Sequence, residues 1–427
     1  MTSDPTYGKI FSKMSLEVVN FGCRLNTYES EVIRKKASEN GVTNAFIINS
    51  CAVTSEAERQ LRQEIRKLKR QHPDKKIIVT GCAVQVNPDK YKSMDEVHSV
   101  IGNVEKMTDR AYAAIRDEKI SLVSDIMTET QLESAVVESF DGKVRGYLQV
   151  QAGCNHRCTF CIIPYGRGNS RSTPFQAVFE QAKSLVEKGY KELVITGVDI
   201  TDYGLDLPGK PKLGQLVKRL LKYLPELPRI RLSSIDVAEV DNDLLDLIAN
   251  EPRFMPHLHL SLQAGDNMIL KRMKRRHSRE QVIEFCKQTL ELRPNIVFGA
   301  DIIAGFPTET DAMFQNTYNL VGEIEKIIHL HIFPYSEREG TPAAKMPKVE
   351  KYIRKDRAAK LRRLGHELLD KHLKSQIGYK VKILSENEKI GRSEDFTVAD
   401  ISQLGIAPGE IVELTVKDII NSKLVIV

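Results

Sequence analysis

The sequence Cys154-Asn-His-Arg-Cys158-Thr-Phe-Cys161 holds three cysteines within eight residues, with the spacing C-x3-C-x2-C. A cubane iron–sulfur cluster normally takes four thiolate ligands. Three ligands leave one iron open, and an open position on a bound metal can accept a substrate or a cofactor. A zinc site formed by the three cysteines and His156 is the alternative. The close spacing favours the iron–sulfur cluster.

The composition limits the class of protein. A chain of 427 residues is long enough for two or three domains, each with its own core. It has no run of about 18 apolar residues, so no membrane-spanning helix is expected. Residues 1–5 lack the basic start and apolar core of a secretory signal. Seven cysteines without such a signal indicate reduced thiols and metal ligands, which predicts a cytoplasmic protein.

Three short apolar runs near the N-terminus each end in a cysteine: Leu16–Cys23, Ala45–Cys51 and Lys76–Cys82. Helical patterns over Tyr28–Glu39 and Ser55–Gln71 follow the first two runs, the second after the capping candidates Thr54 and Ser55. This alternation predicts a doubly wound, parallel α/β sheet. A further strand is expected at Val97–Ile101 and a helix at Val104–Arg116, with a connection between domains over residues 120–143.

The positions of Cys23, Cys51 and Cys82 predict a second cluster site. In a parallel sheet, ligands gather outside the carboxyl ends of the strands, where all three cysteines are expected. Three unrelated buried cysteines are the alternative, since free cysteine is often a core residue. Two sites of three cysteines account for six of the seven. Cys286, within the helical pattern Ser278–Leu292, is left as a packing residue.

The middle of the chain has the pattern of an open barrel. Six strand-like runs recur there: Tyr147–Ala152, Glu192–Gly197, Ile230–Ile235, Leu258–Gln263, Val297–Ile303 and Ile327–Phe333. The clearest helix between them is Pro174–Lys188, with Thr173 as its predicted N-cap and Gly189 after its end. Six βα units predict a partial (βα)6 barrel instead of a closed barrel of eight. The Cys154–Cys161 motif follows the first strand, at the carboxyl-end face. The rim segments Thr196–Asp199, Ser233–Asp236, Ser261–Gln263 and Gly305–Pro307 end the next four strands at the same face, where their hydroxyls, carboxylates and Gln263 could bind a ligand.

Positive charge is concentrated at one segment. From Lys345 to Lys374 there are eleven Lys and Arg against four Asp and Glu. Such a segment could contact a polyanion, or it could be a solvated helix face. Lys271–His277 holds five basic residues at the expected substrate rim, where phosphate contact and a solvated turn are both possible. Short strands are expected after residue 375, at Val381–Leu384, Phe396–Val398, Ile411–Val416 and Leu424–Val427. They predict a small all-β barrel, and a barrel behind a basic helix is consistent with RNA binding.

Several motifs together resemble the methylthiotransferases of the radical S-adenosylmethionine (SAM) enzymes, over nearly the whole chain. The matching motifs are Asn20–Glu31, Asn49–Thr54, Gly81–Gln85, Gly153–Gly168, Asp301–Thr310 and Phe333–Ser336. The resemblance implies an N-terminal three-cysteine domain at 1–135, a radical-SAM domain at 144–374 and a TRAM-like barrel at 375–427. Gly22–Asn26 and Thr196–Gly204 are similar to the bacterial subfamily that modifies threonylcarbamoyl-adenosine in tRNA. Asp199 and Ala264 replace an expected Asn and Ser, and the last domain is short for a TRAM.

The resemblance implies two [4Fe-4S] clusters and SAM. The Cys154/Cys158/Cys161 cluster would reduce bound SAM, and the resulting radical would take hydrogen from an adenosine at position 37, in the anticodon stem-loop of tRNA. The Cys23/Cys51/Cys82 cluster would present the sulfur, and a second SAM would supply the methyl group. An electron donor such as flavodoxin or ferredoxin is implied. The resemblance places Phe160 near the adenine of SAM. Gly197, Asp199, Ser234 and Gln263 are expected as further SAM contacts, because they lie at the carboxyl ends of the barrel strands.

Three other functions fit parts of the same pattern. The target adenosine could carry isopentenyl instead of threonylcarbamoyl at N6. A methylthiotransferase of this architecture could also act on a ribosomal protein, although the basic segment favours RNA. A non-enzymatic RNA-binding protein with structural clusters is the third possibility, and the open iron argues against it.

Overall fold

The computed structural model describes residues 16–133 and 135–427. The chain divides into two compact units between residues 126 and 127. The segment after this point belongs to the second unit, because the backbone N–H of Val137 donates to the side chain of Gln181, which donates back to the Val137 carbonyl. The domain boundaries at residues 135 and 374 stay predictions.

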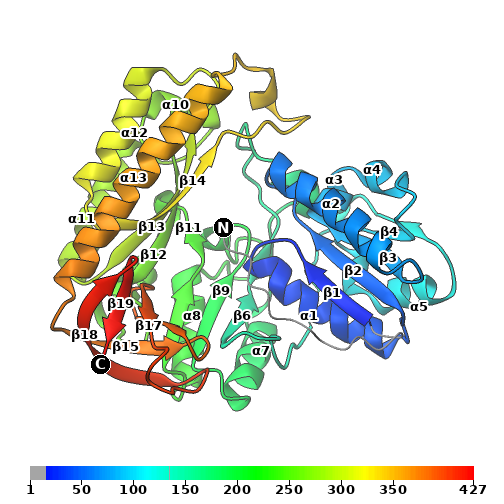
Figure 1. The fold of residues 1–427 in the computed structure, drawn as a ribbon, viewed down its shortest axis with the longest axis horizontal. Helices are drawn as coiled ribbons and strands as arrows, with labels where there is room; N and C mark the ends of the chain where they lie inside the picture. The colour runs from blue at the N-terminus through cyan, green and yellow to red at the C-terminus, as the bar shows by residue number, and fades with distance from the viewer. Residues whose placement is uncertain (1–15, 134) are drawn as a thin grey trace. The chain divides into compact units, whose positions relative to one another are not determined.

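In the described part of the first unit, five parallel strands form one sheet, in the order β1-β2-β3-β4-β5 (Figure 1). They are β1 (Leu16–Asn20), β2 (Ala45–Ser50), β3 (Lys76–Gly81), β4 (Ser99–Ile101) and β5 (Ser121–Leu122). The three runs that end in cysteine are therefore neighbouring strands, as the α/β prediction requires. β5 was not predicted, because two residues are too few to show a strand pattern.

The helices of the first unit are α1 (Arg24–Glu39), α2 (Ser55–Gln71), α3 (Cys82–Val86), α4 (Pro88–Lys92) and α5 (Asp109–Asp117). The predicted cap of α2 is confirmed, since the Thr54 side chain accepts from the N–H of Ala57. The helix predicted over Val104–Arg116 is wrong in its first half. Thr108 has extended backbone dihedrals and separates a short 3₁₀ turn from α5.

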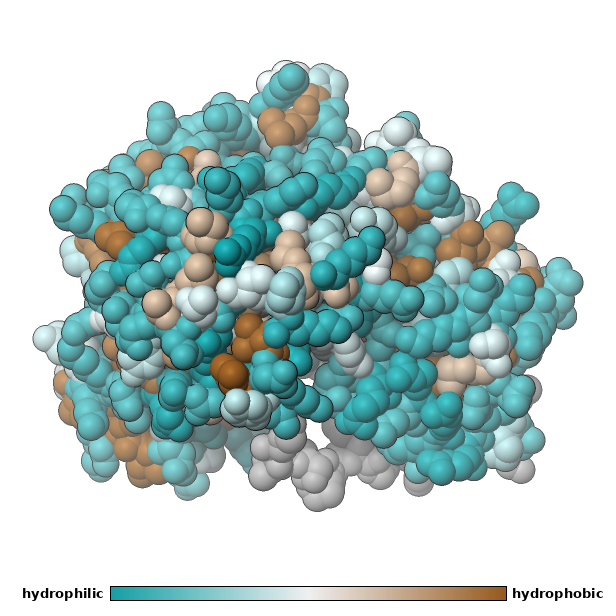
Figure 2. All heavy atoms as spheres, turned by 90° about the horizontal axis from the view of Figure 1, so that it is seen from above, coloured by the Kyte–Doolittle hydropathy of each residue, from teal (hydrophilic) through white to brown (hydrophobic). Residues whose placement is uncertain are grey.

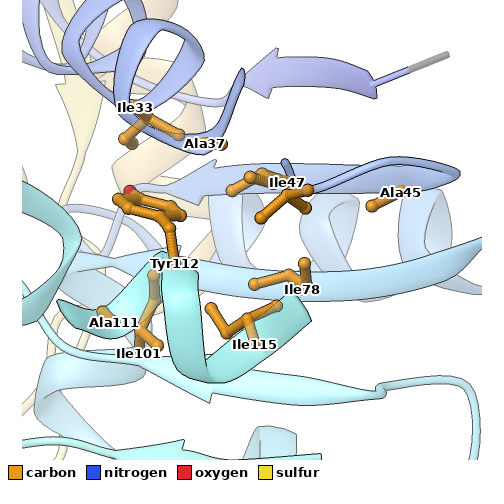
Figure 3. Packing of buried hydrophobic residues seen from close by; sticks show 10 residues of the cluster. Ile33, Ala37, Ala45, Ile47, Ile78, Ile101, Ala111, Tyr112 and Ile115 are labelled. Carbon is orange, nitrogen blue, oxygen red and sulfur yellow. The ribbon is translucent and has the colours of Figure 1, made fainter. Parts of the chain in front are cut away.

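The sheet of the first unit is covered on both faces. On one face, strand side chains such as Ile47 and Ile78 pack against Ile33 of α1 and Tyr112 of α5 (Figure 3). Successive strand residues point to opposite faces. On the other face, the ring of Phe46 contacts that of His72 at the C-terminal end of α2, with 5.2 Å between ring centroids. Buried apolar positions on both faces are what a doubly wound sheet requires.

The central strands of the second unit are parallel and form an open series. Their order is β6-β9-β10 in one sheet and β11-β12-β13-β14 in the next, with Ser233 alone between β10 and β11. The strands are β6 (Arg145–Gln149), β7 (Gln151–Ala152), β8 (Arg171–Ser172), β9 (Glu192–Thr196), β10 (Arg229–Leu232), β11 (Ser234–Ile235), β12 (His257–Gln263), β13 (Val297–Ala304) and β14 (Ile327–Pro334). β7 and β8 form a separate antiparallel ribbon. The predicted six-stranded partial barrel is confirmed.

The helices of this unit are α6 (Ile163–Arg167), α7 (Phe175–Glu187), α8 (Leu213–Tyr223), α9 (Asn242–Asn250), α10 (Asn267–Met273), α11 (Arg279–Leu292), α12 (Asp311–Glu323) and α13 (Lys351–Ser375). The basic segment is thus mostly one helix, α13. The prediction that Thr173 caps α7 is wrong. Pro174 occupies the cap position, because the Thr173 hydroxyl donates to the carbonyl of Gln149 at 3.3 Å.

The C-terminal residues form a closed barrel, in the order β15-β16-β17-β19-β18. Its strands are β15 (Lys380–Ser385), β16 (Ile390–Arg392), β17 (Val398–Asp400), β18 (Ile411–Ile420) and β19 (Lys423–Ile426). The predicted all-β barrel is confirmed, although the strand predicted from Phe396 begins only at Val398. Phe396 has φ = 72°, a left-handed conformation that does not fit a strand.

The small barrel contacts the amino ends of the central strands. Arg145 at the start of β6 pairs with Glu386, and Arg229 at the start of β10 donates to the carbonyl of Lys382. His329, near the start of β14, contacts a carbonyl of the same barrel. The cysteine motif follows the carboxyl end of β6, so the barrel leaves that end of the strands uncovered.

Among the described helices, none is long and apolar enough to cross a membrane. The face of the molecule in Figure 2 is mostly hydrophilic, and its hydrophobic residues form small scattered groups. The large apolar side chains are concentrated instead in the buried cores, on strands and helices alike.

Candidate active site

A tight turn starts the loop that holds the Cys154–Cys161 motif. Gly153 follows β7 with φ = 74°, and a Cβ at this position would lie 1.9 Å from the carbonyl oxygen of Asn169. Any other residue would therefore clash with the backbone as well as strain its own dihedrals. Cys154 comes next, and its N–H donates to the carbonyl of Gly168 at 3.1 Å. The sequence thus fixes the first ligand against the segment after α6.

The centre of the loop is held from the opposite side. The N–H of Thr159 donates to the carbonyl of Met273, and its hydroxyl donates to that of Arg272 at 2.8 Å. Both carbonyls lie at the carboxyl end of α10, where helix carbonyls lack partners within the helix. The neighbouring Phe160 ring contacts Phe306 edge-on, with 6.4 Å between centroids. The loop is therefore fixed by backbone bonds and one aromatic contact.

All three cysteines of the motif line one cavity of about 150 Å³. Four of the predicted SAM contacts line it too: Phe160, Asp199, Ser234 and Gln263. The fifth, Gly197, lies at the end of β9, where a Cβ would be 2.9 Å from the carbonyl oxygen of Gln151. Its place is in the close packing beneath the cavity wall.

Arg275 connects the cysteine loop to two central strands. Its Nη1 lies 3.6 Å from the Cys158 sulfur, and its Nη2 donates to Asp236 at 2.7 Å and to the carbonyl of Ser261 at 2.8 Å. Asp236 also contacts His277 Nδ1 at 3.2 Å. Burial opposes the ionisation of Asp236, but His277 and Arg275 outweigh it and hold the pKa of Asp236 well below its usual range. A fixed positive group thus faces one ligand sulfur.

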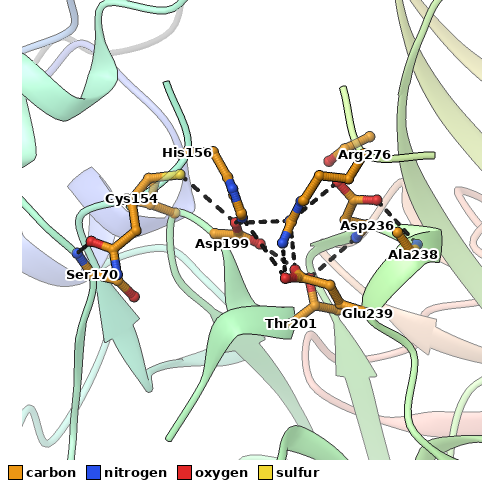
Figure 4. Close-up of polar contacts among 12 residues, drawn as sticks. Cys154, His156, Ser170, Asp199, Thr201, Asp236, Ala238, Glu239 and Arg276 are labelled. Atoms are coloured by element: carbon orange, nitrogen blue, oxygen red, sulfur yellow. Dashed lines mark hydrogen bonds and ion pairs between the residues drawn. The ribbon is translucent and has the colours of Figure 1, made fainter. Parts of the chain in front are cut away.

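A second charged group lies beside Cys154 (Figure 4). The Cys154 sulfur is 3.7 Å from a carboxylate oxygen of Asp199, which pairs with His156 Nε2 at 3.1 Å. Arg276 pairs with Glu239 and lies 3.7 Å from Asp199. The cavity wall combines the carboxylates of Asp199 and Asp236 with the guanidinium of Arg275, which suits a zwitterionic ligand.

The thiols of the motif lie in a poorly solvated environment. Burial, followed by the Asp199 carboxylate, raises the pKa of Cys154 far above the ordinary value for a thiol. Burial raises the pKa of Cys161 to about 11. Thiolates at these positions require a compensating cation, and a bound metal provides one.

The structure does not form the closed zinc site considered above. The ligand atoms of Cys154, His156 and Asp199 lie within 4.8 Å of one another, but Cys158 and Cys161 are not part of this group. A tetrahedral zinc ion would need its four ligands this close together. Three thiols spread around one cavity fit a larger cluster better.

The first unit places its three cysteines at one edge of the sheet. Cys23 is the N-cap residue of α1, Cys51 directly follows β2, and Cys82 is the first residue of α3. The parallel strands β1, β2 and β3 are neighbours, so all three cysteines lie at their carboxyl ends. Cys23 is exposed, Cys51 is half-buried and Cys82 is buried. This arrangement supports the predicted convergence.

Polar side chains join the three cysteine-bearing turns. Asn26 accepts from the Cys23 sulfur at 3.5 Å and donates to the carbonyl of Ser50 at 3.1 Å. The Ser50 hydroxyl accepts from the N–H of Ala83, which follows Cys82, at 3.2 Å. Each bond links one turn to the next, so a shift of one cysteine would disturb the others.

Two protein-family models match the chain. The model described as the radical SAM superfamily covers residues 148–321, and the uncharacterized protein family UPF0004 covers residues 15–102. The threonylcarbamoyladenosine tRNA methylthiotransferase MtaB of Rickettsia prowazekii is 58% identical, over 89% of this chain and 90% of the relative. The chain belongs to the MtaB-type radical SAM methylthiotransferases.

Other relatives are less similar in sequence to this methylthiotransferase. MtaB of Bacillus subtilis is 34% identical, over 86% of this chain and 83% of the relative. The tRNA-2-methylthio-N(6)-dimethylallyladenosine synthase of the same species is 31% identical, over 86% and 75%. The radical S-adenosylmethionine methyltransferase TsrM of Kitasatospora setae has a similar fold, with a TM-score of 0.55 and 14% identity over 78% of this chain and 75% of TsrM.

Sequence reasoning missed part of the site of this methylthiotransferase. Arg275, Arg276 and His277 were expected to contact phosphate or to form a solvated turn, whereas they pair with carboxylates around the cysteine cavity. Asp236 was recognised as part of a rim segment but not as the residue that holds Arg275. The only signal in the sequence was the density of charge after the fourth strand.

Proposed function

We propose that this protein converts N6-threonylcarbamoyladenosine at position 37 of tRNA to its 2-methylthio derivative. The observation that supports this most is the 58% identity to an MtaB over nearly the whole of both chains. The dimethylallyladenosine synthases are more distant, at 30–31% identity. Both cysteine triads lie within the regions that the two family models match, which supports the same chemistry.

Cys154, Cys158 and Cys161 would hold the [4Fe-4S] cluster that leaves one iron for SAM. The three thiols fit this group because they line one cavity together with polar side chains that could bind a cofactor. When bound, the cluster and SAM supply the radical that removes hydrogen from an unreactive carbon. Phe160 would lie against the SAM adenine, while Asp199, Ser234 and Gln263 would bind its polar groups and Gly197 would allow close packing.

The charges of the cavity suit SAM, which has an ammonium group, a sulfonium and a carboxylate. Asp199, which lines the cavity, would face the positive groups of SAM. Arg275 would donate to the Cys158 sulfur and stabilise its thiolate form. Hydrogen bonds to ligand sulfurs also tune the potential of a cluster.

Cys23, Cys51 and Cys82 would hold the second [4Fe-4S] cluster, which presents the sulfur. Three thiols at the carboxyl ends of neighbouring strands fit a cluster with one free iron. Asn26 and Ser50 would keep the ligand turns in register, and Asn103, whose Nδ2 is 3.8 Å from the Cys82 sulfur, would stabilise that thiolate.

Helix α13 and the small barrel would bind the tRNA. Part of the positive charge of α13 is used internally, since Arg357 pairs with Glu309 at 2.7 Å. Lys355 and Arg363 are exposed on the helix, as is Tyr352, which is 71% exposed and lies three residues before Lys355. Cations bind phosphates and exposed aromatic rings stack on bases. A tRNA substrate implies that the protein acts in the cytoplasm, with an electron donor such as flavodoxin or ferredoxin.

Nucleoside mass spectrometry of tRNA from cells with and without the gene tests this proposal. Loss of 2-methylthio-N6-threonylcarbamoyladenosine on deletion, with its return on complementation, is expected. If only the isopentenyl-adenosine derivative disappears, the proposed substrate is wrong and the chemistry stands. If complementation restores no methylthio nucleoside, the target is not tRNA, and ribosomal proteins should be analysed next.

A further inference from the structure

Three neighbouring strands of the partial barrel bring two histidines and an aspartate together, outside the cysteine cavity. Asp301 on β13 accepts from His259 Nε2 on β12 at 3.0 Å and from His331 Nδ1 on β14 at 3.2 Å. The two imidazole rings are 4.7 Å apart between centroids. Both contacts go to the same oxygen of Asp301, so one carboxylate orients both rings.

A glycine on the neighbouring strand provides space for one of the two histidine rings. A Cβ on Gly299, which pairs with His259 across the strands, would lie 2.3 Å from His259 Nδ1. The glycine therefore leaves room for the imidazole ring. Burial opposes the ionisation of Asp301, but His259 and His331 outweigh it and hold the pKa of Asp301 well below its usual range.

His331 is the open member of this group. Its side chain is 61% exposed, whereas those of His259 and Asp301 are 9% and 24% exposed. On β14 the alternate residue Leu330 packs against Gly365 of α13, so His331 points to the other side, into the barrel. Phe333, two residues along, points the same way and is 42% exposed. The inner face of this edge strand therefore presents an imidazole and an aromatic ring.

This face adjoins the cysteine cavity. Phe333 pairs with Ile303 of β13, and Ile303 packs against the same buried cluster as Phe160 of the cysteine loop. On β12, the residues that follow His259 on the same face, Ser261 and Gln263, line the cavity itself. A nucleotide whose reacting carbon lies at the mouth of that cavity would thus have His331 and Phe333 within its surroundings.

We propose that His331 recognises the polar N6 substituent of the substrate adenosine, with Asp301 and His259 as positioning residues and Phe333 against the base. This inference rests on the proposed function. Asp301 accepts from the Nδ1–H of His331, so Nε2 of the neutral imidazole can accept from the hydroxyl of a threonylcarbamoyl group. A dimethylallyl group offers no partner, and burying the imidazole against it would leave a polar atom unsatisfied.

Kinetics with three RNA hairpins test this role. The hairpins match the anticodon stem-loop and carry N6-threonylcarbamoyladenosine, N6-dimethylallyladenosine or adenosine at position 37. In the reconstituted holoenzyme, we expect His331→Phe to lower kcat/KM for the threonylcarbamoyl hairpin at least about tenfold, mainly through KM. The preference over the dimethylallyl hairpin should shrink, while SAM cleavage without RNA stays within about twofold.

Two further variants sharpen the test. Asp301→Asn keeps the size of the side chain but loses its charge, and we expect a smaller rise in KM than in His331→Phe. Gln288→Phe places the same new ring on the exposed face of α11 and should leave all three hairpins unaffected. His331 is exposed, so its replacement should not unfold the protein.

The outcomes separate this inference from the proposed function. If wild-type enzyme does not modify the threonylcarbamoyl hairpin, the proposed function is wrong. If wild-type enzyme prefers that hairpin and His331→Phe keeps the same preference, the role of His331 is wrong. If wild-type protein holds one zinc or manganese ion per chain that His331→Phe loses, His331 is a metal ligand and direct recognition is wrong.

Discussion

The two three-cysteine sites are built in opposite ways. Cys154, Cys158 and Cys161 come from one loop of eight residues, and backbone bonds and neighbouring side chains fix that loop. Cys23, Cys51 and Cys82 come from three strand ends spread over 60 residues, and they lie at one edge of the sheet only because β1, β2 and β3 are neighbours. The first design depends on local turns, and the second depends on the order of strands in a sheet.

The two sites also differ in how far solvent reaches their cysteines. In the loop site the thiols are half-buried or buried around a cavity, with Arg275 close to one sulfur. In the strand-end site the ligands range from the exposed Cys23 to the buried Cys82. A ligand set that binds and activates a cofactor benefits from an enclosed, charged wall. A set that must present sulfur to a substrate needs an open side.

The largest expected effect is loss of the loop site. Replacing Cys154, Cys158 or Cys161 with Ala should reduce SAM cleavage by at least about 1,000-fold, because three thiolates are the minimum ligand set for such a cluster. The measurement is 5′-deoxyadenosine formed by the reconstituted enzyme with a chemical reductant. Cys286→Ala, on the buried face of α11, is the matched control and should keep SAM cleavage. Comparable cleavage in a loop variant would contradict the assignment.

Loss of the strand-end site should separate the two reactions. Replacing Cys23, Cys51 or Cys82 with Ala should leave SAM cleavage within about twofold but lower methylthio product by at least about 100-fold, because metal-ligand networks rarely tolerate a missing ligand. The assay quantifies 5′-deoxyadenosine and methylthio nucleoside in the same reaction. Full product from these variants would remove the second cluster from the mechanism.

Thiol reactivity should show the difference in access without any cluster. In the metal-free protein at pH 8, we expect iodoacetamide to modify the exposed Cys23 at least about tenfold faster than Cys161, whose pKa burial raises to about 11. A thiol reacts as its thiolate, and a higher pKa leaves less of it at this pH. Mass spectrometry of timed digests gives each rate. Equal rates would mean that the loop site opens when the cluster is absent.

Two glycine substitutions should damage one site each, with the smallest expected effect. At Gly81, with φ = 95°, a Cβ would lie 2.4 Å from the backbone nitrogen of Ser50, so Gly81→Ala should lose about half of the iron yet keep SAM cleavage. Gly153→Ala should lose the other half together with cleavage. Gly209→Ala has the same type of strain without a clash and is the control. Loss of all iron from either variant would show that the two sites do not form independently.

The sequence alone determined the elements that are local. The loop site was recognisable because its three ligands lie within eight residues, and the helices α1 and α2 were recognisable from their sequence patterns. The partial barrel followed from six strand-like runs with helices between them. Small errors arose where a few residues decide a boundary, as at Thr108 and Phe396, because a single backbone dihedral there overrides the pattern of the neighbours.

The tertiary structure alone decided which distant side chains meet. Asp236 and Arg275 are 39 residues apart, and Asp301 and His331 are 30 apart, yet each pair is within hydrogen-bond distance. Nothing in the spacing of these residues encodes the contact, because it depends on which strands are neighbours and on their register. Charge density and strand ends indicate where such residues lie. Their partners, and therefore their chemistry, follow only from the packed sheet.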